Sequence, residues 1–164
     1  MSLTHVGPTG QARMVDVGEK SPSRRVAVAE GRVRMSPEAF ALVRENAVAK
    51  GDVLRVAEVA GTMGGKRTAE LIPLCHPLPL DVLRVECVAE ESIPGVRVTA
   101  TASVTARTGV EMEALTAGGI GCLTVYDMVK AVDRQMVIEG IRLLVKTGGT
   151  RGDWHGTVPG AAAG

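Results

Sequence analysis

Three prolines surround a cysteine and a histidine in residues 71–80, LIPLCHPLPL. Proline fixes its own φ and lacks an amide hydrogen, and the residue before a proline avoids the helical region. The backbone that carries Leu74, Cys75 and His76 is therefore expected to be extended and stiff. Such a loop can aim a thiol or an imidazole at a ligand. A buried proline-rich connection, in which His76 caps a neighbouring group, explains the same residues equally well.

Lysine is scarce in this chain, which has five lysines against fourteen arginines. Arginine therefore serves as the general surface cation, and lysine is expected where an ammonium group that can give up its proton is needed. Each lysine has a glycine, an acid or another base close by in the sequence. A GC-rich codon bias explains the ratio but not these neighbours. The lysines are Lys20, Lys50, Lys66, Lys130 and Lys146.

Asp127 and Lys130 are three residues apart in a predicted helix, so their side chains share one face. An acid and an amine held together can act as a general acid/base pair, in which each group shifts the pKa of the other. An ordinary surface salt bridge is the more common origin of this spacing. Tyr126 and the apolar residues around the pair indicate partial burial, which favours the acid/base interpretation.

The same predicted helix begins just after Gly109 with Glu111, Met112 and Glu113. Acidic side chains are favoured at a helix N-terminus by the helix dipole, so simple capping explains the two glutamates. Met112 suits either the core or a soft wall against a flat ligand.

Two segments combine glycines, cations and hydroxyl groups in the way that phosphate-binding loops do. They are residues 64–68, GGKRT, and residues 146–149, KTGG, and neither has the spacing of a Walker motif. Their cations and two others would suit an anionic ligand, most readily a polyphosphate. Solvated loops are the alternative interpretation. The cations concerned are Arg25, Lys50, Lys66, Arg67 and Lys146.

Composition excludes several other functions. The net charge is +1 and the chain has one Trp, one Tyr and one Phe, so neither a basic surface nor a stacking platform for nucleic acid is expected. No apolar run approaches the roughly 20 residues of a membrane span, and the N-terminus lacks a signal peptide's apolar core. The three cysteines form no CxxC pair, and His5, His76 and His155 lack metal-ligand spacing. A cytoplasmic protein without a metal site is expected.

The 164 residues predict one domain over residues 1–156, with about twenty loosely ordered residues at the start and a flexible tail at 157–164. Residues 14–17, MVDV, are the part of the first segment that could dock. Richness in Val and Ala predicts a strand at 25–35, and alternating apolar residues predict a hairpin formed by the strands around 83–87 and 96–104. A last strand is predicted at 137–146.

Three helices are predicted between these strands. One starts at Ser36-Pro37 and runs to about Lys50, and a second begins at Asp52 and frays at Gly61 and Gly64-Gly65. The third covers 111–133, and the glycines at 118, 119 and 121 suggest that another backbone approaches it closely. Its predicted apolar stripe is Met112, Leu115, Gly119, Cys122 or Leu123, and Tyr126. The order β-α-α-β-β-α-β predicts an α+β, ferredoxin-like fold with one extra helix, its helices on one face of an antiparallel sheet.

Six segments of the chain, taken in order, resemble the molybdenum-cofactor biosynthesis protein C family over roughly residues 3–154. The resemblance implies a ferredoxin-like hexamer, a trimer of dimers, with active sites at a dimer interface. It also implies the activity of a cyclic pyranopterin monophosphate synthase. That activity converts a cyclised dihydro-GTP, handed over by a radical enzyme, into cyclic pyranopterin monophosphate and diphosphate. The segments are residues 14–17, 66–68, 71–78, 108–117, 126–132 and 146–149.

The resemblance also implies roles for individual residues. Asp127 and Lys130 correspond to the central acid/base pair, and Lys50 corresponds to a lysine needed for turnover. Departures from the family pattern at Ala69 and at Gly118-Gly119 concern packing. The substrate-contacting residues implied are Leu74, Cys75, His76, Met112 and Glu113, with Glu111 beside them, and the implied anion contacts are Lys20, Arg25, Lys66, Arg67 and Lys146.

The implied reaction fits these residue types. It rebuilds a heterocycle by proton transfers and closes a cyclic phosphate while expelling diphosphate, so it needs acid/base groups beside cations rather than electron transfer. No cofactor is expected, although Mg²⁺ could accompany the triphosphate. The alternative is a non-enzymatic regulatory module that binds an anionic ligand, which would need the cations but not the Asp127–Lys130 pair.

Overall fold

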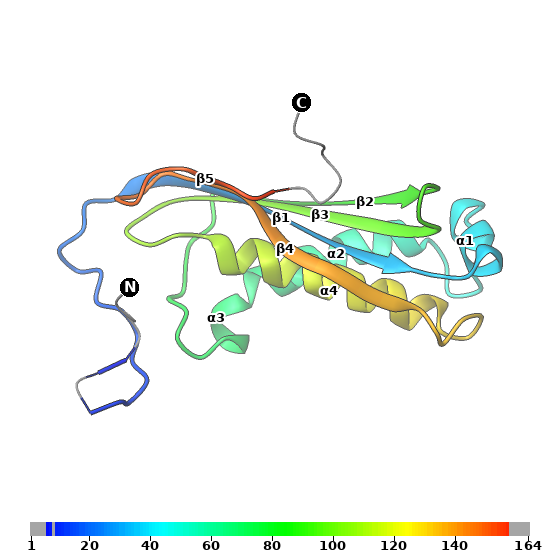
Figure 1. The fold of residues 1–164 in the computed structure, drawn as a ribbon, viewed down its shortest axis with the longest axis horizontal. Helices are drawn as coiled ribbons and strands as arrows, with labels where there is room; N and C mark the ends of the chain where they lie inside the picture. The colour runs from blue at the N-terminus through cyan, green and yellow to red at the C-terminus, as the bar shows by residue number, and fades with distance from the viewer. Residues whose placement is uncertain (1–5, 8, 158–164) are drawn as a thin grey trace.

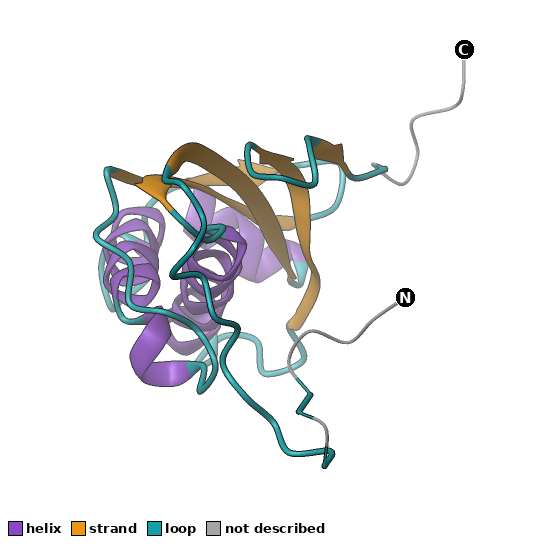
Figure 2. Cartoon of the chain, turned by 90° about the vertical axis from the view of Figure 1, so that its left-hand side faces the viewer, coloured by secondary structure: helices purple, strands orange, loops and turns teal. Residues whose placement is uncertain are grey.

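The computed structural model describes residues 6–7 and 9–157. Five antiparallel strands form one sheet in the order β2-β3-β1-β4-β5, and the helices cover one face of it (Figures 1 and 2). In chain order the elements are β1 Ser23–Arg34, α1 Pro37–Arg44, α2 Val53–Lys66, α3 Thr68–Leu71, β2 Val82–Glu90, β3 Gly95–Ala106, α4 Glu111–Val129, β4 Val137–Thr147 and β5 Trp154–His155. The predicted ferredoxin-like α+β fold is confirmed, with the short α3 and β5 as additions.

The alternation predicted in the β2–β3 hairpin follows from burial on one side of the sheet. Val98 and Ala100 on β3 are fully buried against the helices, whereas Arg97 and Thr99 point to the other face. In the sheet, Gly31 of β1 lies opposite Val98 of β3, and the pairing of these two strands runs without a register shift. This half-buried pattern is what an antiparallel sheet covered on one side requires.

Helix α1 is shorter than predicted, because it ends at Arg44 instead of continuing to Lys50. Asn46 adopts φ 53°, in the left-handed region that asparagine tolerates better than most residues. The amide of Ala47 then donates to the carbonyl of Leu42 at 2.8 Å, which closes the helix end in the Schellman manner. Lys50 therefore lies in a loop before α2, whose predicted N-cap, Asp52, accepts a hydrogen bond from the amide of Arg55.

Helix α2 does not fray at its glycines, because they allow α4 to pack closely against it. A Cβ built at Gly61 would lie 2.8 Å from the carbonyl oxygen of Ala117, and one at Gly64 would lie 2.6 Å from Ile120 Cγ1. The close approach predicted from the glycines of α4 is thus made chiefly by glycines of α2. On α4 itself Gly121 is crowded, by Val98 Cγ1 at 2.8 Å.

Helix α4 ends at Val129, earlier than predicted, and its buried stripe differs from the predicted one. Ala114, Ala117, Cys122 and Val125 are fully buried between the sheet and α2, whereas Leu123 is 56% exposed. Small residues of α4 face α2 because the backbones of these two helices are close. The larger Leu123 lies on the exposed side of α4 instead.

The segment before β1 contributes Val15 and Val17, both half-buried, so residues 14–17 do pack against the domain. The remaining expectations for residues 1–5, 8 and 158–164, including the position of His5, lie outside the described residues. Among the helices that the structure describes, none is long and apolar enough to cross a membrane.

Candidate active site

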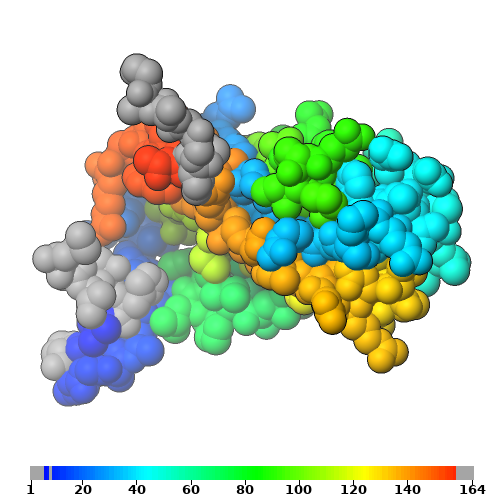
Figure 3. All heavy atoms as spheres, turned by 45° about the vertical axis from the view of Figure 1, so that its right-hand side comes forward, coloured from blue at the N-terminus to red at the C-terminus, as the bar shows by residue number. Residues whose placement is uncertain are grey.

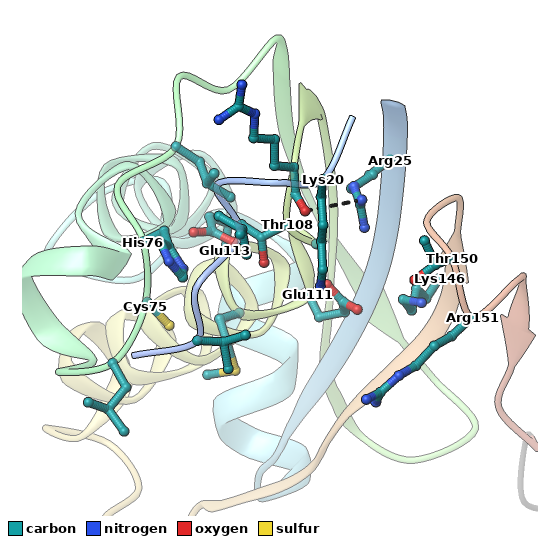
Figure 4. A pocket seen from close by; sticks show the side chains of 17 residues that line it. Lys20, Arg25, Cys75, His76, Thr108, Glu111, Glu113, Lys146, Thr150 and Arg151 are labelled. Carbon is teal, nitrogen blue, oxygen red and sulfur yellow. Dashed lines mark hydrogen bonds between the residues drawn. The ribbon is translucent and has the colours of Figure 1, made fainter. Parts of the chain in front are cut away.

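A cleft of about 280 Å³ opens at the N-terminal end of α4 (Figure 4). The proline-rich loop forms one wall, and the segment before β1 and the ends of β1 and β4 form the others. Nine of the eleven predicted ligand-binding residues line this cleft, whereas Lys66 and Arg67 lie on the exposed end of α2 and do not. The nine are Lys20, Arg25, Leu74, Cys75, His76, Glu111, Met112, Glu113 and Lys146.

The proline-rich loop has neither helix nor strand from Cys75 to Leu80. The amide of Cys75 donates to the carbonyl of Ile72 at 3.1 Å, which closes a turn just before this stretch. Leu78 and Leu80 pack against the buried cluster that contains Val110. These anchors hold the loop beside the first turn of α4, so Cys75 and His76 line the cleft.

One end of the cleft carries the acid and the thiol. Glu113 is 4% exposed, and burial raises the pKa of its carboxyl group. The pKa of the half-buried Cys75 thiol is raised as well, first by burial and then by the charge of Glu113. Figure 4 shows His76 on the same side as these two residues. This end offers hydrogen-bonding groups that suit a flat polar ring.

The other end of the cleft carries cations. Figure 4 shows Lys146, Thr150 and Arg151 together on the side of the cleft away from His76, with Lys20 and Glu111 between the two ends. Ammonium and guanidinium groups beside a hydroxyl group suit phosphate oxygens. The cleft is therefore polarised along its length, as a ligand with a ring at one end and phosphates at the other would need.

Sequence reasoning missed four polar residues of the cleft. Arg107 and Thr108 lie in the β3–α4 loop, and Thr150 and Arg151 lie between β4 and β5. The glycines around the second pair were the available signal, because Gly148, Gly149 and Gly152 all have positive φ and shape a tight turn there.

A second cluster, the lysine cluster, consists of Lys50, Asp127 and Lys130. The Lys130 ammonium donates to Asp127 Oδ1 at 2.6 Å, and the Lys50 ammonium donates to Oδ2 at 3.0 Å and to the Asp127 carbonyl at 2.9 Å. Lys130 first and Lys50 second lower the pKa of the Asp127 carboxyl group. The predicted pairing of Lys130 with Asp127 is confirmed, and Lys50 also binds Asp127.

The partial burial expected for this pair is wrong within the single chain. Side-chain exposure is 57% for Asp127, 50% for Lys130 and 47% for Lys50. Asp127 lies in the last turn of α4 and Lys130 is its C-cap, and both side chains are exposed although Met128 and Val129 of the same turn are buried in the core. The lysine cluster is held by its own hydrogen bonds instead of by burial.

The cleft and the lysine cluster lie at opposite ends of α4. Glu113 and Asp127 are fourteen residues apart on this helix, which corresponds to about 21 Å at 1.5 Å per residue. Figure 3 shows the same separation, with the chain near residue 50 and the end of α4 on one side and the β4–β5 segment on the other. Within one chain, therefore, the two groups of residues do not form one compact site.

The comparisons with known proteins cover both groups of residues. A model of the MoaC family matches residues 14–149. The curated cyclic pyranopterin monophosphate synthase of Brucella ovis is 58% identical over 152 residues, which make up 93% of this chain and 92% of the relative. The protein of the same name from Methylobacterium nodulans is 59% identical over 151 residues, covering 92% of this chain and 94% of the relative.

Proposed function

This chain belongs to the MoaC family, and from that premise we propose that it makes cyclic pyranopterin monophosphate for molybdenum cofactor biosynthesis. Its substrate is the cyclised dihydro-GTP that a radical enzyme supplies, and its second product is diphosphate. Because the reaction expels diphosphate by closing a cyclic phosphate, the enzyme is a phosphorus–oxygen lyase. The polarised cleft is the observation that carries this proposal, since its two ends match the ring and the triphosphate.

Each group of residues has a chemical task in this proposal. The cations Lys20, Lys146 and Arg151 neutralise the triphosphate and stabilise the diphosphate as it leaves. Glu113 and His76 hold the ring by hydrogen bonds at the other end. Lys130 and Asp127 transfer protons as the heterocycle opens and closes, and Lys50 keeps the Asp127 carboxylate in place.

The separation of the cleft from the lysine cluster supports an active site shared between two chains. We propose a homo-hexamer, a trimer of dimers, in which one chain's lysine cluster covers its neighbour's cleft. Covering would also bury the exposed lysine cluster, which strengthens its hydrogen bonds by removing water. The length of α4 supports this arrangement over one within a single chain.

Mixed oligomers test the shared site. Lys146→Ala removes a cleft cation and Lys130→Ala removes a member of the lysine cluster, so each variant alone should be nearly inactive. Subunits mixed at equal amounts should regain activity, because random pairing makes about one quarter of the sites from two intact halves. A mixture that stays inactive, or a monomeric mass by light scattering at micromolar concentration, would contradict the proposal.

We propose that the reaction needs no bound metal or other cofactor. The described residues contain no group of three or more metal-ligating side chains, and Cys75, Cys87 and Cys122 are all unpaired. Free thiols suit a reducing compartment, which supports a cytoplasmic enzyme. Activity should survive removal of tightly bound transition metals by a chelator. Loss of activity that a stoichiometric transition metal restores would refute this point, whereas Mg²⁺ carried by the triphosphate is a separate matter.

The decisive test supplies the cyclised dihydro-GTP and measures diphosphate and an oxidisable, fluorescent pterin. A protein that only binds an anionic ligand would release neither product. Asp127→Asn separates catalysis from binding of an anionic ligand, because the amide keeps the shape of the side chain but not its charge. An enzyme should lose turnover while its affinity for a substrate analogue stays within a few-fold. A regulatory binding protein should show no product in either form.

A further inference from the structure

Arg25 lines the cleft, but its guanidinium group is already engaged with the backbone. The side chain projects from β1 on the same side as Ala27, which is fully buried, and Arg25 itself is 8% exposed. Its Nε donates to the carbonyl of Ala106 at 3.0 Å, and its Nη2 donates to the carbonyl of Arg107 at 3.2 Å. Figure 4 shows the second of these hydrogen bonds as a dashed line.

The first of these carbonyls ends β3, and the second belongs to the loop that leads from β3 into α4. The loop carries Arg107 and Thr108 to the cleft and sets where α4 begins, and therefore where Glu111 and Glu113 lie. Ala106 and Arg107 are 81 and 82 residues from Arg25 in the sequence. Arg25 thus connects the start of the domain with the acidic end of the site.

The β4–β5 turn packs against the same guanidinium group from the other side. Gly149 has φ 86°, and a Cβ built on it would lie 2.4 Å from Arg25 Nη1. A flexible side chain normally yields to such a contact at little cost. Arg25 could yield only by giving up its hydrogen bonds to Ala106 and Arg107. Gly149 therefore leaves the space that the guanidinium group needs.

We propose that Arg25 is a positioning residue, which fixes the β3–α4 loop beside the cleft. This inference rests on the proposed function only for its effect on turnover. A guanidinium group presents its donors in a planar fork, and two of them fit the successive carbonyls of Ala106 and Arg107. The ammonium of a lysine would keep the charge but not the fork.

Two variants separate positioning from binding of an anion. Arg25→Lys keeps the positive charge and loses the fork, and Gly149→Ala keeps Arg25 and removes the space for its guanidinium group. Gly152→Ala is the matched control, because Gly152 lies in the same turn with φ 73° and nothing lies within 4 Å of a Cβ built there. Both alanine variants impose the same backbone strain, but only one of them contacts Arg25.

Trypsin gives a readout that does not depend on the reaction, because it cleaves after Arg107 when the loop opens. Cleavage of a transiently opened segment follows the population of the open form. Arg25→Lys and Gly149→Ala should each increase the rate of cleavage after Arg107 by about tenfold or more, the change expected from losing one charge-assisted hydrogen bond. Gly152→Ala should leave the rate within about two-fold of wild type.

Turnover and diphosphate binding complete the test. Arg25→Lys and Gly149→Ala should lower kcat by about tenfold or more, and in Arg25→Lys, which leaves the β4–β5 turn unchanged in sequence, inhibition by diphosphate should change by less than about three-fold. The proposal is overturned if either variant keeps the wild-type cleavage rate, if Gly152→Ala opens the loop equally, or if the diphosphate affinity of Arg25→Lys falls in parallel with its kcat. Should the wild-type protein make no product, the proposed function fails, and the trypsin measurement still decides the role of Arg25.

Discussion

The Lys130 ammonium nitrogen lies 2.6 Å from Asp127 Oδ1, one helical turn further along at the end of α4. Because the other carboxylate oxygen accepts from Lys50, Asp127 holds two ammonium groups at fixed positions. All three side chains are about half exposed in the single chain. Hydrogen bonds alone therefore arrange this group, so removing one member should change chemistry far more than folding.

Lys130→Ala should lower turnover by about 10²–10⁴-fold, which is typical of losing a general acid or base. The circular dichroism spectrum and the melting temperature should stay close to those of the wild type, since exposed ion pairs contribute little to stability. Arg134→Ala is the matched control, because it removes an exposed cation four residues away that is outside the lysine cluster. Turnover at the wild-type rate in Lys130→Ala would remove this residue from the mechanism.

His76→Ala should reduce activity more than Cys75→Ser, and it should cost little stability. The prolines and the packing of Leu78 and Leu80 keep the loop in place without the imidazole. The raised pKa of Cys75 keeps its thiol protonated at neutral pH, so it should serve as a packed neighbour of Glu113 instead of a nucleophile. Steady-state kinetics and thermal melting of the two variants provide the measurement. Unfolded, insoluble His76→Ala protein would establish a structural role instead.

Glu113→Gln should change how stability depends on pH. The pKa of Glu113 is higher in the folded protein than in the unfolded chain, because the carboxyl group is buried. The folded protein therefore loses stability as the pH rises through the glutamate range and the buried carboxyl group must ionise. The melting temperature of the variant relative to wild type should therefore increase as the pH rises from about 4, the ordinary glutamate range, towards neutrality. A difference that stays constant or decreases over this interval would contradict the burial effect.

Gly61→Ala and Gly119→Ala should have opposite effects on stability. The added methyl group at position 61 would lie 2.8 Å from a backbone oxygen of α4, so the variant should lose about 1–3 kcal/mol through overpacking. At position 119 the nearest atom is Ile141 Cδ1 at 3.8 Å, so helix propensity should raise stability by up to about 1 kcal/mol. Urea unfolding measures both. Equal effects would show that the space around these glycines does not decide the outcome.

Much of this structure could be predicted from residues that are close in the sequence. Strand alternation around Val98, the cap at Asp52 and the absence of helix and strand around His76 depend on local backbone preferences and on burial of one face. The pairing of Lys130 with Asp127 follows from helical spacing for the same reason. Helix ends and the buried face of α4 were less predictable, because packing between helices overrides propensity at Gly61 and Leu123.

The sequence by itself determined the types of residues in the site, and the motifs of a family imply roles for several of them. Only the tertiary structure decided which of them meet. Lys50 reaches Asp127 across 77 residues, and Arg25 reaches Arg107 in the β3–α4 loop across 82. The same fold keeps Glu113 and Asp127 apart, because a continuous α-helix between them sets a fixed rise per residue. Contacts between distant segments depend on how whole elements pack, which local residue patterns do not specify.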